Sequence, residues 1–280
     1  MRIILARPAG FCGGVKRAVD QLETVLNVHR RDGVPVYGFH YPVHNTHVIR
    51  ELEALGLIII NRLSDIQKKG ILAISAHGVS PSVIEEATSM GMEVLDTTCP
   101  KVSQVQRAAS RLYQEGYRVF ILGDPNHAEV KGIAGWCGGR LEVIEGEGAL
   151  PAISPDEKIG LIAQTTQNEA LFQKVAEAIG RCTTQLLAIN TICAATQNRQ
   201  KAALELAEQT DVLLVIGDPK SANTRRLTQL CESHTRTFQI QEASDIEPTW
   251  FTGVNTVGVT AGASTPQRVI DEVIDFLERL

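Results

Sequence analysis

Short apolar runs alternate with longer amphipathic stretches along the whole chain. The short runs are rich in β-branched residues, which is typical of buried strands. We expect strands at 3–6, 36–39, 57–60, 72–75, 94–96, 119–122, 141–144, 159–163, 186–190, 212–216, 237–240 and 256–260. We expect helices at 15–26, 48–55, 81–90, 101–115, 169–179, 199–208, 224–233 and 266–280. Strand–helix alternation with continuous apolar strands predicts parallel α/β units.

Three of the polar turns that follow the expected strands are similar. The segments "FCGGV", "TTCPKV" and "TICAAT" each follow an apolar run and precede a helical stretch. Each contains one cysteine: Cys12, Cys99 and Cys193. These cysteines are 87 and 94 residues apart in a chain of 280, so each third of the chain supplies one.

Two further polar turns follow each cysteine turn at similar distances. In chain order they contain His44 and His77, then His127 and Thr165, then Ser221 and Ser264. Two of them, "GDPNHAEV" and "GDPKSANT", also share Gly-Asp-Pro. The matching order predicts a threefold internal repeat, with α/β lobes at 13–98, at 99–192, and at 193–280 together with 1–12.

Three such lobes would form a trefoil-like protein with pseudo-threefold symmetry. Ligands of open α/β sheets bind beyond the carboxyl ends of the strands. If the three lobes face one another, the cysteines and polar turns meet at one central site. The alternative is that polar turns follow strands in any α/β protein and that a free cysteine is often a small buried apolar residue. Cys137, Cys182 and Cys231 have no matched partners, and we expect them to be structural.

Composition narrows the classes of function. The chain is 44% hydrophobic and 21% charged, as in globular proteins, and its net charge of −5 gives no reason to expect binding to nucleic acid or to a membrane surface. Aromatic residues make up only 5%. We find no secretory signal and no apolar run long enough to span a bilayer, and we therefore expect a cytoplasmic protein. Six cysteines in that compartment favour metal or redox chemistry over disulfides.

Three thiolates can hold zinc with a fourth ligand or an open position. They can also hold three irons of a [4Fe-4S] cluster and leave the fourth iron open. Separations of about ninety residues match no zinc finger, whose ligands are paired within a few residues. Spacing alone does not decide between the two metals. An open iron would be a Lewis acid, and a cluster could deliver electrons to the same substrate atom.

The surrounding turns are suited to an anion. His44 and His77 belong to turns rather than to apolar stripes. Ser221 and Asn223 begin one helical stretch and Ser264 precedes another, where backbone N–H groups attract phosphate. Together they predict a site that accommodates a diphosphate. The alternative for the hydroxyl residues is simple helix capping. We favour it for each of them taken singly, and for Thr224 also when the residues are considered together.

The segment "NHAEV" places His127 and Glu129 two residues apart on an expected polar turn. A carboxyl group beside a histidine can deliver protons. A solvated surface turn is the alternative of equal weight.

The motifs together resemble a known family. In chain order, "GFCGGVKRA", "VHN", "SAHGVS", "DTTCPKV", "HAEV", "AQTTQ", "TICAATQNRQ", "SANTRRL" and "VGVTAGAST" are similar to those of the 4-hydroxy-3-methylbut-2-enyl diphosphate reductases, the IspH/LytB family. The resemblance runs from Ile3 to about Leu280. Nine motifs in order make it specific, whereas any one alone would be weak.

The resemblance implies an iron–sulfur oxidoreductase of three lobes with one [4Fe-4S] cluster at its centre. The implied reaction is the last step of the non-mevalonate (MEP) pathway of isoprenoid biosynthesis. It reductively removes the allylic hydroxyl of the substrate to give isopentenyl and dimethylallyl diphosphates. The implied electron donor is a ferredoxin, a flavodoxin or a similar carrier.

The resemblance also implies a role for each matched residue. Cys12, Cys99 and Cys193 would hold the cluster and leave one iron open. Glu129 would be the catalytic proton donor, helped by His127 and Thr165. The residues expected to bind the diphosphate are His44, His77, Ser221, Asn223 and Ser264.

The sequence departs from the family pattern at several positions. Ala128 stands where the family usually has proline, which is expected to loosen the turn that holds Glu129. Ala222 replaces the second of two serines, and Ala194 follows Cys193 where tyrosine is common. Tyr41-Pro42 precede the His44 motif. No matched cluster or acid position is lost, so we expect an active enzyme.

Three alternatives stay open from the residues. The chain could be a diverged paralogue that acts on another small allylic or phosphorylated substrate. It could be a non-catalytic anion-binding module with structural thiols. It could also be a zinc hydrolase that uses Glu129 as a base.

Overall fold

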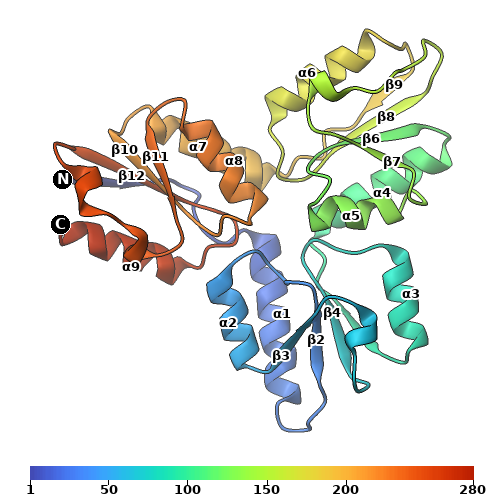
Figure 1. Cartoon of the computed structure of the whole chain (residues 1–280), viewed down its shortest axis with the longest axis horizontal. Helices are drawn as coiled ribbons and strands as arrows, with labels where there is room; N and C mark the ends of the chain where they lie inside the picture. Colours follow the sequence, from blue (N-terminus) through green and yellow to red (C-terminus); the bar gives the residue numbers. More distant parts are fainter. The chain divides into compact units, whose positions relative to one another are not determined.

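The structure, a computed structural model, describes all 280 residues, Met1–Leu280. It contains twelve strands, nine α-helices and four short 3-10 helices (Figure 1). The strands form three four-stranded sheets in which all neighbours are parallel. The predicted class, three α/β lobes built on parallel sheets, is therefore confirmed.

The chain divides into two compact units. Unit 1 comprises Met1–Val15, His44–Val48 and Ala194–Leu280. Unit 2 comprises Lys16–Val43 and Ile49–Cys193. One sheet lies in unit 1 and two lie in unit 2. The lobe boundaries expected from the cysteine spacing stay a prediction.

The sheet of unit 1 joins the two ends of the sequence. Its strand order is β1 (Arg2–Leu5), β12 (Thr256–Ala261), β10 (Val212–Ile216) and β11 (Arg236–Ile240). Its helices are α7 (Ala194–Ala207), α8 (Ala222–Cys231) and α9 (Gln267–Glu278). The first strand of the sequence is thus an edge strand that pairs with the last one.

Side chains of β10 alternate between two apolar layers, as a pleated strand requires. Leu214 packs with Val273 of α9, whereas Leu213 packs with Leu206 of α7 and Leu227 of α8. All five side chains are at most 5% exposed. Burial of each large apolar side chain contributes about 1.5–3 kcal/mol, and both faces of the sheet are covered.

Unit 2 contains two sheets with the same topology. One has the order β3 (Leu57–Ile60), β2 (Val36–Phe39), β4 (Ile71–Ile74) and β5 (Glu93–Asp96). The other has the order β7 (Leu141–Ile144), β6 (Arg118–Leu122), β8 (Ile159–Ala163) and β9 (Leu186–Ala188). The remaining helices lie wholly or mostly in unit 2: α1 (Gly13–His29), α2 (Thr46–Ala54), α3 (Pro81–Ser89), α4 (Pro100–Gln114), α5 (Ala128–Gly135) and α6 (Glu169–Gly180).

The three sheets repeat one chain path. From each cysteine turn the chain passes through a helix, an inner strand, a helix, an outer strand, a 3-10 helix and a second inner strand. The 3-10 helices at this place are η1 (Leu63–Asp65), η2 (Glu147–Ala149) and η3 (Ala243–Asp245), and a fourth, η4 (Pro248–Phe251), occurs only in the last sheet. One edge strand of each sheet (β1, β5 or β9) leads directly to a cysteine turn.

The predicted elements agree with the observed ones to within a few residues, with one omission. All twelve predicted strands and eight of the nine helices are present. The helix that the sequence did not suggest is α5, which occupies the segment expected to be a polar turn around Glu129. No helix has the length and apolar character needed to cross a membrane.

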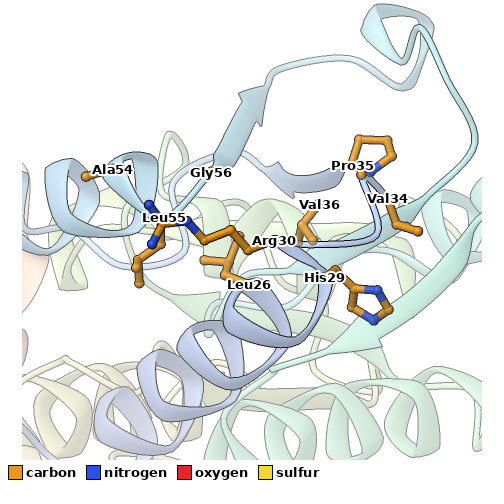
Figure 2. A pocket seen from close by; sticks show the side chains of 10 residues that line it. Leu26, His29, Arg30, Val34, Pro35, Val36, Ala54, Leu55 and Gly56 are labelled. Carbon is orange, nitrogen blue, oxygen red and sulfur yellow. The ribbon is translucent and has the colours of Figure 1, made fainter.

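A cavity of about 310 Å³ opens at the end of unit 2 where β2 begins (Figure 2). It is lined by the last turn of α1, including Leu26, by the end of α2 with Leu55 directly after it, and by the segment that leads into β2. No residue predicted to take part in the site lines this cavity.

Candidate functional site

The three cysteines occupy equivalent places at the carboxyl ends of the three sheets. The backbone N–H of each cysteine donates a hydrogen bond of 3.0 Å to a carbonyl two residues beyond the end of an inner strand. The acceptor is Ala263 for Cys12, Ala76 for Cys99 and Thr165 for Cys193. The sequence repeat therefore corresponds to a repeated hydrogen bond.

Each cysteine also lies directly before a helix: α1, α4 or α7. Cys12, Cys99 and Cys193 form no disulfide and are partly buried. The positive end of a helix favours an anion such as a thiolate. The Cys12 sulfur already accepts a 3.4 Å hydrogen bond from the backbone N–H of Val15. These donors suit a thiolate-bound metal group.

Glu129 is the most buried acidic side chain of unit 2, at 2% exposure. It lies in the first turn of α5, whose cap is His127, and the Glu129 N–H donates to His127 Nδ1 at 3.2 Å. Thr165 donates to the carboxylate twice, from its backbone N–H at 2.7 Å and from its hydroxyl at 2.8 Å. The expected polar turn, and the solvated surface turn offered as its alternative, were both wrong at this place.

Burial raises the pKa of Glu129 to about 7, although the two hydrogen bonds from Thr165 act in the opposite direction. Removal from water disfavours the charged carboxylate more than the two donors stabilise it. Near neutral pH the group is therefore divided between its acid and base forms, which suits a proton donor.

Unit 2 brings several predicted residues into one chain of contacts. The rings of His77 and His127 meet edge to face, with centroids 5.2 Å apart. Thr165 links the carboxyl of Glu129 to the backbone N–H of Cys193. Cys99 belongs to the same set, because its backbone N–H donates to the carbonyl of Ala76, the residue directly before His77.

Unit 1 brings together a second set. The Ser264 hydroxyl donates to the backbone carbonyl of His44 at 2.8 Å. Burial lowers the pKa of His44, as do nearby Arg225 and Lys220, while Asp218 acts in the opposite direction. The neutral imidazole is thus favoured in a cation-rich surrounding.

The N-terminus of α8 contributes the other residues of this set. Ser221 is the cap, and its hydroxyl oxygen accepts the N–H of Thr224 at 3.3 Å. Capping by Thr224, which we favoured, was wrong. The Thr224 hydroxyl is buried against Gly262. A Cβ added to Gly262 would lie only 2.2 Å from the hydroxyl oxygen of Thr224. Both side-chain polar atoms of Asn223 are buried and have no hydrogen-bond partner.

A buried amide with no partner is rare, because it loses its hydrogen bonds to water without replacement. A ligand group or an ordered water bonded to the amide would remove this cost. The amide of Asn223 can both donate and accept, and the Ser221 hydroxyl can still donate while its oxygen caps α8. The start of α8 therefore suits an anionic ligand.

Sequence reasoning missed three contributors. Asp218 accepts the hydroxyl of Thr46 at 2.9 Å and the N–H of Lys220 at 2.8 Å. Asp124, its counterpart in the other Gly-Asp-Pro segment, accepts the N–H of Asn126 at 2.8 Å. The shared Gly-Asp-Pro was the available signal for these Asp-stabilised turns. For Arg199, which is buried in α7, the sequence offered no indication of a role beyond its place in "TICAATQNRQ".

Comparisons with known proteins agree over the whole chain. The family model described as "LytB protein" matches residues 3–278. A relative named 4-hydroxy-3-methylbut-2-enyl diphosphate reductase from Citrifermentans bemidjiense is 40% identical, with 100% of this chain and 98% of the relative covered. A relative of the same name from Dehalococcoides mccartyi is 40% identical, with 100% and 99% covered.

Two solved structures are similar as well. One is described as (E)-4-hydroxy-3-methyl-but-2-enyl diphosphate reductase, the terminal enzyme of the non-mevalonate pathway; it covers 100% of both chains at 36% identity and a TM-score of 0.72. The other, the E-1-hydroxy-2-methyl-but-2-enyl-4-diphosphate reductase from Plasmodium falciparum, covers 100% of this chain and 87% of its own at 29% identity and a TM-score of 0.90. The chain belongs to the LytB protein family.

Proposed function

We propose that this protein is an oxidoreductase that converts (E)-4-hydroxy-3-methylbut-2-enyl diphosphate into isopentenyl and dimethylallyl diphosphates. Family membership supports this activity, as do the names of relatives that are similar over the full chain. The observation that carries it is the contact chain from Cys193 through Thr165 to Glu129, which links a metal-type ligand to a titratable carboxyl group.

Cys12, Cys99 and Cys193 would hold a [4Fe-4S] cluster with one open iron. Their partly buried thiols, which form no disulfide and lie directly before helix N-termini, fit such a group. When bound, the cluster supplies electrons and a Lewis-acid position. Because zinc also accepts three thiolates, metal analysis is part of the test below.

The reaction consumes two electrons and two protons for each substrate. The allylic C–O bond breaks, the hydroxyl leaves as water, and a new C–H bond forms on the allyl group. Glu129 is half protonated near pH 7 and would supply protons for these steps. Thr165 fixes both carboxyl oxygens of Glu129, and His127 fixes its backbone N–H.

Each unit, taken by itself, offers polar groups suited to a phosphate of the substrate. In unit 1, Asn223 offers a buried amide without a partner, and the Ser221 hydroxyl lies at the start of α8. Ser264 would exchange its bond to the His44 carbonyl for a phosphate oxygen. His77 and His127 of unit 2 would contribute ring N–H groups. A one-electron carrier such as a ferredoxin or a flavodoxin would supply the electrons.

The test is anaerobic purification followed by metal analysis, electron paramagnetic resonance and turnover with a chemical reductant. We expect iron and sulfide, the signal of a cluster, and consumption of the allylic diphosphate only when reductant is present. A colourless protein with stoichiometric zinc would overturn the proposal. Turnover without reductant would indicate a hydrolase, and diphosphate binding that survives loss of all three thiols would indicate a binding module.

A further inference from the structure

Arg199 is a charged side chain buried inside unit 1. It lies on α7 and is 3% exposed. Its guanidinium donates to two backbone carbonyls: that of Ala195, in the first turn of the same helix, at 2.9 Å, and that of Gly10 at 2.7 Å. Gly10 is two residues before Cys12, and Ala195 is two residues after Cys193.

The Gly10 end of this contact depends on a special backbone. Gly10 has φ of +76°, which side-chain-bearing residues rarely adopt. A Cβ at this position would lie 2.9 Å from Ile270 Cδ1 and 3.1 Å from the Thr265 carbonyl oxygen. The turn before Cys12 is therefore held in one conformation, with its carbonyl bonded to the guanidinium.

The internal repeat shows that helix packing does not demand an arginine here. The residue six positions after each cysteine is Ala18, Val105 or Arg199, and all three are buried, at 0%, 1% and 3%. After Cys12 and Cys99, the buried position is filled by a small apolar side chain, alanine or valine. Since burial of a charge is costly, the arginine after the third cysteine calls for a separate explanation.

We propose that Arg199 is a positioning residue for the Cys12 thiol, holding the Gly10–Cys12 turn against α7 and placing a buried positive charge on that turn. The planar fork of the guanidinium can bond both carbonyls at once, which a lysine ammonium does less well. The positive charge would stabilise thiolates and would favour the reduced, more negative state of a bound cluster. This electrostatic part rests on the proposed function, whereas the positioning part does not.

The positioning part is tested in the cluster-free protein by alkylating each cysteine with iodoacetamide over a range of pH, followed by peptide mass spectrometry. The rates compared are the limiting rates of the fully ionised thiols, because these report access to the sulfur and do not depend on how far Arg199 stabilises the thiolate. In Arg199→Gln, we expect Cys12 to react several-fold faster and Cys99, which lies in unit 2, to keep its rate. Arg118→Gln is the matched control: Arg118 of β6 bonds the Glu142 carboxylate at both oxygens and contacts no cysteine turn. Arg118→Gln should leave the Cys12 rate unchanged.

Two further variants keep this test decisive. Arg199→Lys preserves the charge, so it guards against a failure of Arg199→Gln to fold, and it should still accelerate the alkylation of Cys12. Gly10→Ala disturbs the same contact from its other end, so combining it with Arg199→Gln should add little to either change alone. An unchanged Cys12 rate in folded Arg199→Gln, or an equal rise in Arg118→Gln, would overturn the inference.

The charge is tested on the reconstituted protein by its reduction potential. Arg199→Gln should lower the midpoint potential relative to the wild type, and Arg199→Lys should restore it. Equal potentials in all three proteins would overturn this part. If the wild type takes up no iron–sulfur cluster, the proposed function fails, while the alkylation rates still decide whether Arg199 positions Cys12.

Discussion

Thr165 bonds both oxygens of the buried Glu129 carboxyl group, one with its backbone N–H and one with its hydroxyl. Its own carbonyl accepts the N–H of Cys193. One residue at the end of β8 therefore fixes a proton donor and a thiol-bearing turn together. A shift of the β8 end would move both groups at once.

Replacing Glu129 by Gln should lower kcat by about 10²- to 10⁴-fold, because the amide cannot donate a proton as an acid does. The fold should persist, since the Gln oxygen still accepts one donor of Thr165. The measurement is turnover with a chemical reductant, together with iron content. Glu115→Gln, in an exposed pair with Arg111, is the matched control. Wild-type turnover in Glu129→Gln would remove Glu129 from the mechanism.

The contribution of Glu129 to the stability of the wild type should fall as the pH rises from about 4.5 to about 7, the interval between the ordinary pKa of Glu129 and its raised value. In this interval the unfolded chain loses its proton while the folded protein keeps it, and above it the folded protein must ionise a buried group. The loss that Glu129 causes over this interval is about 3 kcal/mol.

Urea unfolding of the wild type and of Glu129→Gln at several pH values measures this loss. The difference between the two proteins should change across the interval and become constant above it. Because only the protonated form donates, turnover should also decline above about pH 7. Parallel stability curves would contradict the assignment of the raised pKa to Glu129.

Cys99→Ser and Cys193→Ser should each lose most of the bound iron, because a neutral hydroxyl is a poor ligand for a soft metal group. Cys182→Ser is the control, since this exposed thiol donates only to the Ala178 carbonyl within its own helical segment. It should keep the iron content and the cluster signal of the wild type. Equal iron loss in all three variants would indicate general oxidation damage and not ligand loss.

Asn223→Leu should leave thermal stability unchanged or raise it, because it removes a buried amide without partners. The same change should raise KM for the diphosphate by about 10- to 100-fold, as expected when a buried hydrogen-bonding group for the substrate is lost. Thermal unfolding and steady-state kinetics measure the two effects. Asn198→Leu, at an exposed position of α7, is the control and should leave KM unchanged. A large loss of stability in Asn223→Leu would instead assign Asn223 a structural role.

Ala128→Pro should stabilise the protein by about 0.4–1 kcal/mol and leave turnover unchanged. Ala128 is the first residue of α5, where proline is favoured. The preceding residue, His127, has φ of −71° and ψ of 139°, which a following proline allows. Thermal unfolding measures the change. Destabilisation would show that the Ala128 N–H is needed, and the loosened turn expected from the absence of proline would then lack support.

The strands and the order of the polar turns along the chain could be predicted, because each apolar run is short, rich in β-branched residues and followed by a polar turn. The helix α5 could not, because its eight residues include two glycines, which are poor helix formers. Gly132 and Gly135 instead allow close packing: a Cβ on Gly135 would lie 2.2 Å from Ser80 Cβ. The nearby Trp136 Nε1–H donates to the Val79 carbonyl at 3.1 Å. Glycine here marks contact with the His77 turn, which single-sequence periodicity cannot reveal.

The residue types of the candidate site were readable from the repeat, but their environments were not. A carboxyl group in a polar segment suggests exposure, and only the fold places Thr165 against Glu129 across 36 residues of sequence. The missing partners of Asn223 and the buried charge of Arg199 likewise depend on distant packing. Motifs therefore identify the candidate site residues, whereas the burial and the pKa values of their side chains are set by tertiary contacts.

The pairing of β1 with β12 has a consequence for synthesis in the cell. Arg2 is paired with Thr256, and the Cys12 N–H bonds the carbonyl of Ala263. The first cysteine to leave the ribosome therefore acquires its native surroundings only after nearly all of the chain has been made. Both sheets of unit 2 can form earlier, during translation. Cys12 must stay reduced throughout this delay, and a complete set of three thiols exists only on the finished polypeptide.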